Sequence, residues 1–255
     1  MELTRRAAAL VVVSTLAGCT TPQGDTESDD GRSVPEASLY HVSTIDALEC
    51  GHFSDETTIG ELLENGGFGL GTVDGVDGEL AIVNGEAYAV RGDGSAVEVD
   101  PETTTPFAAV TEFKSEKTVE LGSVDSFEEF DAQLTAELPR TDHFYALDIT
   151  GEFSFLQTRS VERQIEPYPT LEEVLENETV FEFEDTSGDM PTFYIPKQFD
   201  NIHPPGYHAH FVTDERDGGG HVYDFRADSL TVEIAQLESV TVELPEREVE
   251  KYPPC

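Results

Sequence analysis

The chain has 255 residues, of which 53 are acidic and 14 are lysine or arginine, so its net charge is −39. The basic residues are few and form no cluster. This excludes nucleic-acid binding, because phosphate contacts need grouped lysine and arginine. Hydrophobic residues still make up 38% of the chain, which argues against overall disorder and for a folded, acidic protein adapted to high salt.

The first eighteen residues have the pattern of an export signal. Arg5 and Arg6 precede a short apolar run, and residues 16–19 read Leu-Ala-Gly-Cys, which matches the lipobox of bacterial-type lipoproteins. We expect residues 1–18 to be a lipoprotein signal peptide and Cys19 to carry the lipid. The protein would then be exported to the cell surface and held at the membrane by this anchor alone.

Residues 19–37 are polar and contain glycine and proline, which predicts a flexible tether. The remaining residues, 38–255, form the expected folded domain. Besides Cys19 the chain has only Cys50 and Cys255. Export permits a disulfide between these two, and the sequence leaves open whether they pair or stay free thiols.

The sequence of the first part of the domain predicts short helices and strands, and glycines separate several of the strands. Helical patterns cover Ile45–Leu48, Thr58–Leu63 and Ser126–Leu138. Strands are predicted at Phe68–Val73, Glu79–Val83, Ala87–Arg91 and Phe107–Phe113. Asn84-Gly85 is typical of the turn in a hairpin.

The second part predicts mainly paired strands and one short helix, Thr170–Glu176. The strands are His143–Ile149 and Glu152–Thr158, as a hairpin around Thr150-Gly151, then Val180–Glu184, Thr192–Ile195, Val222–Arg226 and Leu230–Ile234. This pattern predicts an α+β fold of mainly mixed and antiparallel β-sheets in two closely packed lobes, with a few short helices and the functional site in the cleft.

Three of the seven histidines fall within one short segment that predicts a metal site. His208 and His210 are spaced i, i+2, so on a strand both imidazoles project from one face. The following Asp217-Gly218-Gly219-Gly220 predicts a turn that returns His221 beside them. Three imidazoles leave a zinc-like ion with open positions, as in catalytic rather than structural sites.

Two charged residues are candidates for the chemistry around such a metal. Arg159 lies among apolar residues of a predicted strand, where arginine is scarce in this chain. Glu79 begins another predicted strand. From the residues alone, an ordinary surface ion pair is the stronger explanation of Arg159, and Glu79 is one acid among many.

Short motifs along almost the whole domain, about Leu39 to Pro245, closely resemble those of α-acetolactate decarboxylases, in the order of that family. The motifs are Gly60-Glu61-Leu62-Leu63, Gly67-Phe68-Gly69-Leu70-Gly71-Thr72, Asp77-Gly78-Glu79-Leu80, Thr105-Pro106-Phe107-Ala108, Thr158-Arg159, Pro167-Tyr168-Pro169, Gly206-Tyr207-His208-Ala209-His210-Phe211, Gly218-Gly219-Gly220-His221-Val222 and Asp224-Phe225.

The resemblance implies a lyase that converts 2-acetolactate (2-hydroxy-2-methyl-3-oxobutanoate) into acetoin and CO₂ with zinc. It implies His208, His210 and His221 as ligands of a metal that acts as Lewis acid and electron sink. Arg159 and Glu79 would be the catalytic charged pair, for charge stabilisation and protonation. Three imidazoles also suit other divalent metals, and the family's dimers suggest a homodimer as one option for the assembly.

The sequence differs from the family pattern at the C-terminus. Family members usually have a tail there that brings a further glutamate into the site. Glu246, Glu248 and Glu250 lie near the end of this chain, and none of them is assigned that role. The glutamate that would replace the tail acid, and with it the stereochemistry of protonation, is therefore left open.

Two alternative functions are compatible with a histidine hairpin. A cupin-like metalloenzyme acting on another small oxygenated acid would place a glutamate shortly after the His-x-His pair, but the nearest acids here, Asp214 and Glu215, fall in the predicted turn. A metal-capturing lipoprotein without catalysis would have no need of Arg159 or Glu79.

Overall fold

The computed structural model describes residues 37–55 and 57–244. The signal peptide, the lipid anchor at Cys19, nearly all of the tether, the C-terminal glutamates and Cys255 lie outside the described residues and stay predictions. Cys50 is disulfide-bonded. No helix among the described residues is long and apolar enough to cross a membrane.

Strands dominate the described residues and are interrupted by short helices. The helices are α1 (Ile45–Glu49), α2 (Ile59–Leu63), α3 (Phe127–Glu137) and α4 (Leu171–Leu175), with 3-10 turns η1 (Asp74–Val76) and η2 (Lys197–Phe199). The strands are β1 (Ser38–Val42), β2 (Phe68–Thr72), β3 (Glu79–Val83), β4 (Glu86–Val90), β5 (Ala96–Glu98), β6 (Ala108–Thr111), β7 (Lys117–Leu121), β8 (Phe144–Ser160), β9 (Thr179–Ile195), β10 (Gly206–Thr213), β11 (Gly219–Leu237) and β12 (Ser239–Glu243).

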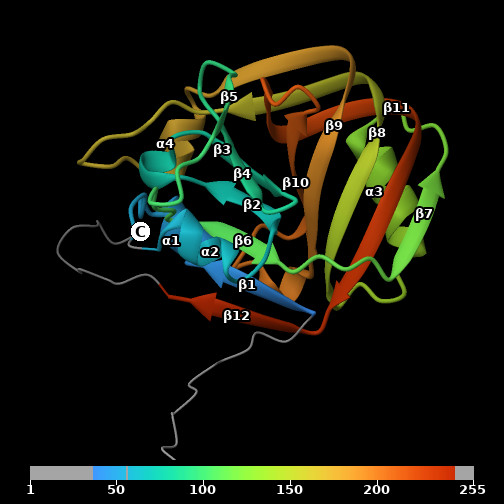
Figure 1. Cartoon of the computed structure of the whole chain (residues 1–255), viewed down its shortest axis with the longest axis horizontal. Helices are drawn as coiled ribbons and strands as arrows, with labels where there is room; N and C mark the ends of the chain where they lie inside the picture. Colours follow the sequence, from blue (N-terminus) through green and yellow to red (C-terminus); the bar gives the residue numbers. More distant parts are fainter. Residues whose placement is uncertain (1–36, 56, 245–255) are drawn as a thin grey trace, which may run out of the picture. The chain divides into compact units, whose positions relative to one another are not determined.

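These strands form two sheets (Figure 1). The first has seven strands in the order β12-β1-β6-β2-β3-β4-β5, and the second has five in the order β10-β9-β8-β11-β7. Strand β10 also pairs with β11, so the second sheet closes on itself. All pairs are antiparallel except β1 with β12, which confirms the predicted α+β fold of mixed and antiparallel sheets.

The two sheets pack on each other through buried apolar side chains. Leu39 and Leu70 of the first sheet lie in one cluster with Ala146 and Phe193 of the second. Helix α3 covers another face of the second sheet, where its Phe130 joins a separate cluster. Burial of apolar surface stabilises both contacts. Strand β3 of the first sheet contacts β10 of the second, and the candidate site lies at this junction.

Local signals predicted the short helices and the β3–β4 hairpin, whereas the short strands β1, β5, β7 and β12 were not predicted. Thr58 is the N-cap of α2 and forms a capping box with Glu61. Asn84 and Gly85 both have positive φ angles, 53° and 79°, in the turn between β3 and β4, which is the conformation that favours Asn-Gly in hairpins.

The predicted hairpin at Thr150-Gly151 is wrong, because β8 runs through it as one strand of 17 residues. Gly151 pairs with Gly188 on β9 and with Leu230 on β11. A Cβ atom at Gly151 would lie 2.8 Å from the Leu230 side chain, so this glycine permits close strand packing beside a register shift and does not form a turn.

The strands predicted separately at Val180–Glu184 and Thr192–Ile195 are likewise parts of β9, and the final predicted pair forms part of β11, of 19 residues. Strand β11 changes register against β8 around Ala227 and Leu230. Polar residues at such bulges have the composition of a turn while the strand continues.

Candidate metal centre and catalytic pocket

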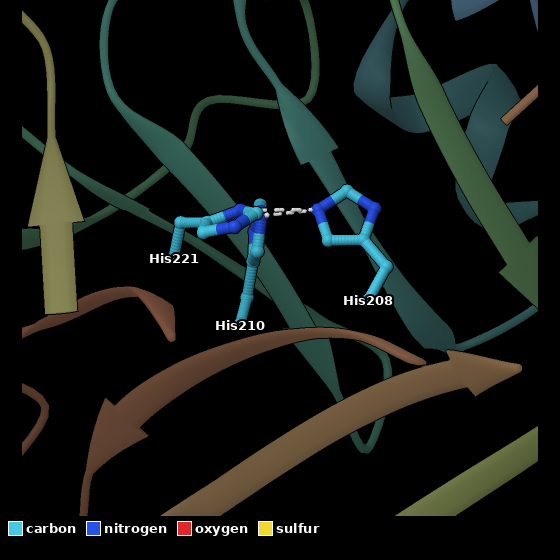
Figure 2. Close-up of side chains that lie close together, drawn as sticks. All are labelled: His208, His210 and His221. Atoms are coloured by element: carbon cyan, nitrogen blue, oxygen red, sulfur yellow. Dashed lines mark hydrogen bonds between the residues drawn. The ribbon is translucent and has the colours of Figure 1, made fainter. Parts of the chain in front are cut away.

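His208, His210 and His221 converge where β10 and β11 pair (Figure 2). Pairing of the two strands sets His221 directly opposite His210. Nε2 of His208 lies 3.2 Å from Nε2 of His210 and 3.1 Å from Nδ1 of His221. Nitrogens bound to one tetrahedral zinc ion at about 2 Å would lie about 3.3 Å apart, so the spacing fits a single ion.

Two glycines allow the hairpin to bring His221 this close. A Cβ atom at Gly219 would lie 2.0 Å from the Phe211 carbonyl oxygen, and one at Gly220 would lie 2.5 Å from the Arg159 carbonyl oxygen. Both glycines also have positive φ angles, 151° and 127°. Larger residues would push β11 away from both neighbouring strands, which explains the glycine run before His221.

The hydrogen bonding and the protonation state of the imidazoles suit them to act as metal ligands. Nδ1 of His210 lies 2.7 Å from the Leu80 carbonyl oxygen. Since a carbonyl can only accept, Nδ1 carries the proton and Nε2 of the neutral ring presents its lone pair to the cluster. Burial is the main cause that lowers the pKa of all three rings below the ordinary histidine value. The rings are therefore neutral at neutral pH, which is the form that binds metals.

Glu79 and Arg159 meet beside this cluster. Their side chains form an ion pair through Oε1 and Nη1, and Oε2 of Glu79 lies 3.3 Å from Nε2 of His210. Glu79 begins β3, whereas Arg159 lies on β8 directly opposite His221. All five site residues predicted by the sequence and its resemblance are thus brought together, and the two charged side chains are only 8% and 12% exposed.

Two further residues at this site were missed by sequence reasoning. Glu178 lies just before β9, and its Oε2 is 3.5 Å from Nε of Arg159. The Tyr223 hydroxyl donates to the same oxygen at 2.6 Å, and the Tyr223 ring packs edge-on against His221. Burial, followed by this hydrogen bond, raises the pKa of Tyr223 to about 12. Glu178 was indistinguishable among so many acids, because only the fold places it beside Arg159.

A pocket of about 310 Å³ opens onto the three histidines, Glu79 and Arg159. Its other walls are mainly apolar side chains of the helices, the loop before β10 and the first sheet, namely Ile45, Leu48, Val76, Phe107, Leu171, Leu175, Pro204 and Pro205. The size is at the lower end for ligand pockets and suits a small acid. Glu49, Thr72 and Asp200 also line the cavity. The mainly apolar walls strengthen the electrostatic interactions of its charged groups with a ligand.

The fold and the site define a two-sheet α+β protein with a three-histidine centre suited to a catalytic metal. Residues 39–252 match the family model described as alpha-acetolactate decarboxylase, and the chain belongs to this family.

Relatives with that name are similar over most of their length. The chain is 37% identical over 243 residues to the alpha-acetolactate decarboxylase of Methanosarcina mazei, covering 89% of this chain and 84% of the relative. The Bacillus subtilis strain 168 enzyme is 34% identical over 214 residues, covering 84% of each chain. Its crystal structure superposes with a TM-score of 0.81 at 33% identity, covering 83% of this chain and 91% of that one.

Proposed function

We propose that this protein decarboxylates 2-acetolactate to acetoin and CO₂ with a divalent metal held by His208, His210 and His221. The observation that carries the proposal is the convergence of three neutral imidazoles and the Glu79–Arg159 pair in one small pocket, in a chain of this family. Zinc is the proposed ion because it accepts three imidazoles and keeps a position open for substrate. A bound ion would supply a Lewis acid that polarises the ketone oxygen of the substrate.

The reaction needs an electron sink and one proton. The bond between C2 and the carboxylate breaks, CO₂ leaves, and the electron pair delocalises into the neighbouring ketone. Carbon C2 then takes up one proton, which gives acetoin. The protein must therefore hold the substrate carboxylate, stabilise negative charge on oxygen and deliver a proton to one carbon atom.

Arg159 is suited to the electrostatic part of this task. Its guanidinium is held between the carboxylates of Glu79 and Glu178 and lines the pocket. A planar donor group fixed in this way needs no reorganisation when charge develops on the substrate. We propose that Arg159 orients the substrate and stabilises the negative charge of the electron-rich product of CO₂ loss.

Glu79 is suited to the proton transfer. It lies between Arg159 and His210, with Oε2 3.3 Å from Nε2 of His210, so it borders the position where the substrate's oxygens and C2 would lie. Glu79 is ionised in its pair with Arg159, so we propose that it takes up one proton from solvent during the reaction and passes it to C2. The contribution of a positioned acid of this kind is typically about 10²- to 10⁴-fold in rate.

The two alternative functions account for fewer of these contacts. Capture of metal alone requires neither the buried ion pair nor the apolar pocket. A cupin-like site would take its carboxylate from the chain just after His210, but Asp214 accepts a hydrogen bond from Ser187, and the acid next to the imidazoles is Glu79 from the other sheet.

Incubation of the zinc-loaded protein with racemic 2-acetolactate in high salt tests the proposal. We expect acetoin and CO₂ in equal amounts, no turnover for His210→Ala and normal turnover for His143→Ala, which changes a partly exposed histidine paired with Asp142. Stoichiometric zinc without acetoin would refute the decarboxylase function and favour metal capture.

A further inference from the structure

Two more histidines, His41 and His203, continue from the metal centre into the protein interior. Nδ1 of His208 lies 2.6 Å from Nε2 of His203, and Nδ1 of His203 lies 2.8 Å from Nε2 of His41. Nδ1 of His41 lies 3.1 Å from the carbonyl oxygen of Ser43. Both rings are completely buried. Each ring nitrogen of His41 and His203 therefore has one hydrogen-bond partner, and none of these nitrogens faces solvent.

The rings are held in place by the first sheet and by the loop before β10. His41 belongs to β1 of the first sheet, whereas His203 lies between η2 and β10. Phe107 packs against both, edge-on to His41 at 4.9 Å between ring centroids and stacked on His203 at 5.4 Å. Aromatic packing of this kind stabilises the orientation of the rings, and the hydrogen bonds described above fix their nitrogen positions.

The carbonyl of Ser43 sets the direction of every hydrogen bond in the chain. A carbonyl oxygen only accepts, so Nδ1 of His41 must carry the proton. Burial lowers the pKa of His41 to about 4, so the ring is neutral and its Nε2 can only accept. His203 must then donate from Nδ1 and accept at Nε2. His208 in turn donates from Nδ1, which leaves its Nε2 as a lone pair aimed at His210 and His221.

The opposite direction carries two penalties. It would set a lone pair of His41 against the carbonyl oxygen of Ser43 in the protein interior, where an unpaired acceptor is destabilising. It would also put an N–H of His208 into the metal cluster. Ser43 itself has a positive φ of 64° and bonds through its own N–H to the Glu243 carbonyl oxygen at 2.7 Å. A non-glycine residue in this conformation is uncommon and aims the carbonyl at His41.

We propose that His203 and His41 are positioning residues that fix the tautomer of the metal ligand His208. Because the Ser43 carbonyl accepts from His41, each ring of this relay in turn accepts from the next, and Nδ1 of His208 must donate. The Leu80 carbonyl has the same effect on Nδ1 of His210 through one direct hydrogen bond. Partners of this kind orient a ligating histidine and raise its basicity. The inference rests on the proposed function in one respect, because it takes the three histidines to bind a metal.

Substitutions that keep or remove single hydrogen bonds separate this role from simple packing. His203→Phe fills the space but gives Nδ1 of His208 no acceptor, whereas His203→Gln offers an amide oxygen there. His41→Phe removes the acceptor for His203 two steps away from the metal. Phe107→Leu loosens packing around the same rings and leaves each hydrogen-bonding group in place.

The experiment records the ¹⁵N histidine spectrum of the metal-free protein, which distinguishes Nδ1–H from Nε2–H rings, and measures zinc affinity by competition with a chelator. We expect Nδ1–H on His208 in the wild type, His203→Gln and Phe107→Leu. We expect about 10- to 100-fold weaker zinc binding for His203→Phe, and for His41→Phe a weaker affinity together with Nε2–H on His208.

Nε2–H on His208 in the metal-free wild type would overturn the proposal, and so would equal losses of zinc affinity for His203→Gln and His203→Phe. The tautomer measurement needs neither metal nor substrate. A protein with the expected tautomer that forms no acetoin would therefore refute the proposed function and leave the relay standing.

Discussion

Glu79 and Arg159, 80 residues apart in the sequence, form an ion pair that joins the first sheet to the second inside the catalytic pocket. Both side chains are nearly buried, so loss of one partner leaves an uncompensated charge in a low-dielectric environment. The pair therefore links the junction between the sheets to the proposed catalytic site. Substitutions here should keep shape and hydrogen bonding as far as they can.

Arg159→Lys should leave zinc stoichiometry intact and lower kcat by about 10²- to 10³-fold. Lysine keeps the charge, but it cannot contact Glu79 and Glu178 while also presenting a planar fork to the substrate. Metal analysis and steady-state kinetics on the same preparation measure both quantities. Wild-type kcat in this variant would show that charge alone, and not guanidinium geometry, is needed.

Glu79→Gln should reduce acetoin formation by about 10²- to 10⁴-fold, because the amide cannot supply the proton that C2 receives. Glutamine can still accept a hydrogen bond from Arg159, so folding should be preserved. Glu86→Gln is the matched control, since Glu86 is exposed at the start of β4 and bonds only to Tyr88 among the contacts described. Equal activity of the two variants would remove Glu79 from the mechanism.

Removal of zinc should lower thermal stability, because an ion that binds only the folded state stabilises it by about 2.7 kcal/mol at one hundred times its Kd. His210→Ala should have a Tm that no longer depends on zinc concentration. Differential scanning calorimetry with and without a chelator measures the effect. A zinc-dependent Tm that persists in His210→Ala would place the bound ion elsewhere.

The stability of the metal-free protein should fall as the pH decreases from about 6.5 to 4. The pKa of His41 is lowered to about 4 by burial, whereas histidine in the unfolded chain has a pKa near 6.5. Within this window the unfolded state binds more protons, so acid favours unfolding by up to about 3 kcal/mol for this group. Urea unfolding at several pH values should show a shallower dependence for His41→Gln; an identical slope would contradict the assignment.

The metal cluster was predictable because its geometry is local. Alternation along one strand and a glycine-rich turn are sufficient to bring His208, His210 and His221 together. Glu79 and Arg159 needed the family resemblance, since they come from β3 and β8 and meet only in the folded chain. His41 and His203 carried no signal at all, because isolated histidines have no pattern until the sheets pack.

The long strands were not predictable from local sequence patterns. Thr150-Gly151 resembles a turn by composition, yet β8 continues through it because β9 and β11 pair on both sides and the register shift of β11 takes up the bend. Bulges in long, twisted strands have the residue preferences of turns. Only the pairing partners, which lie far away in sequence, distinguish the two.

Titration of the metal-stripped protein with zinc, with acetoin and CO₂ from 2-acetolactate measured at each step, tests the central claim most directly. The proposed site predicts no turnover without metal and a linear rise that ends at one ion per chain. Full turnover in the stripped protein, or one tightly bound zinc per chain without acetoin, would contradict the proposed function.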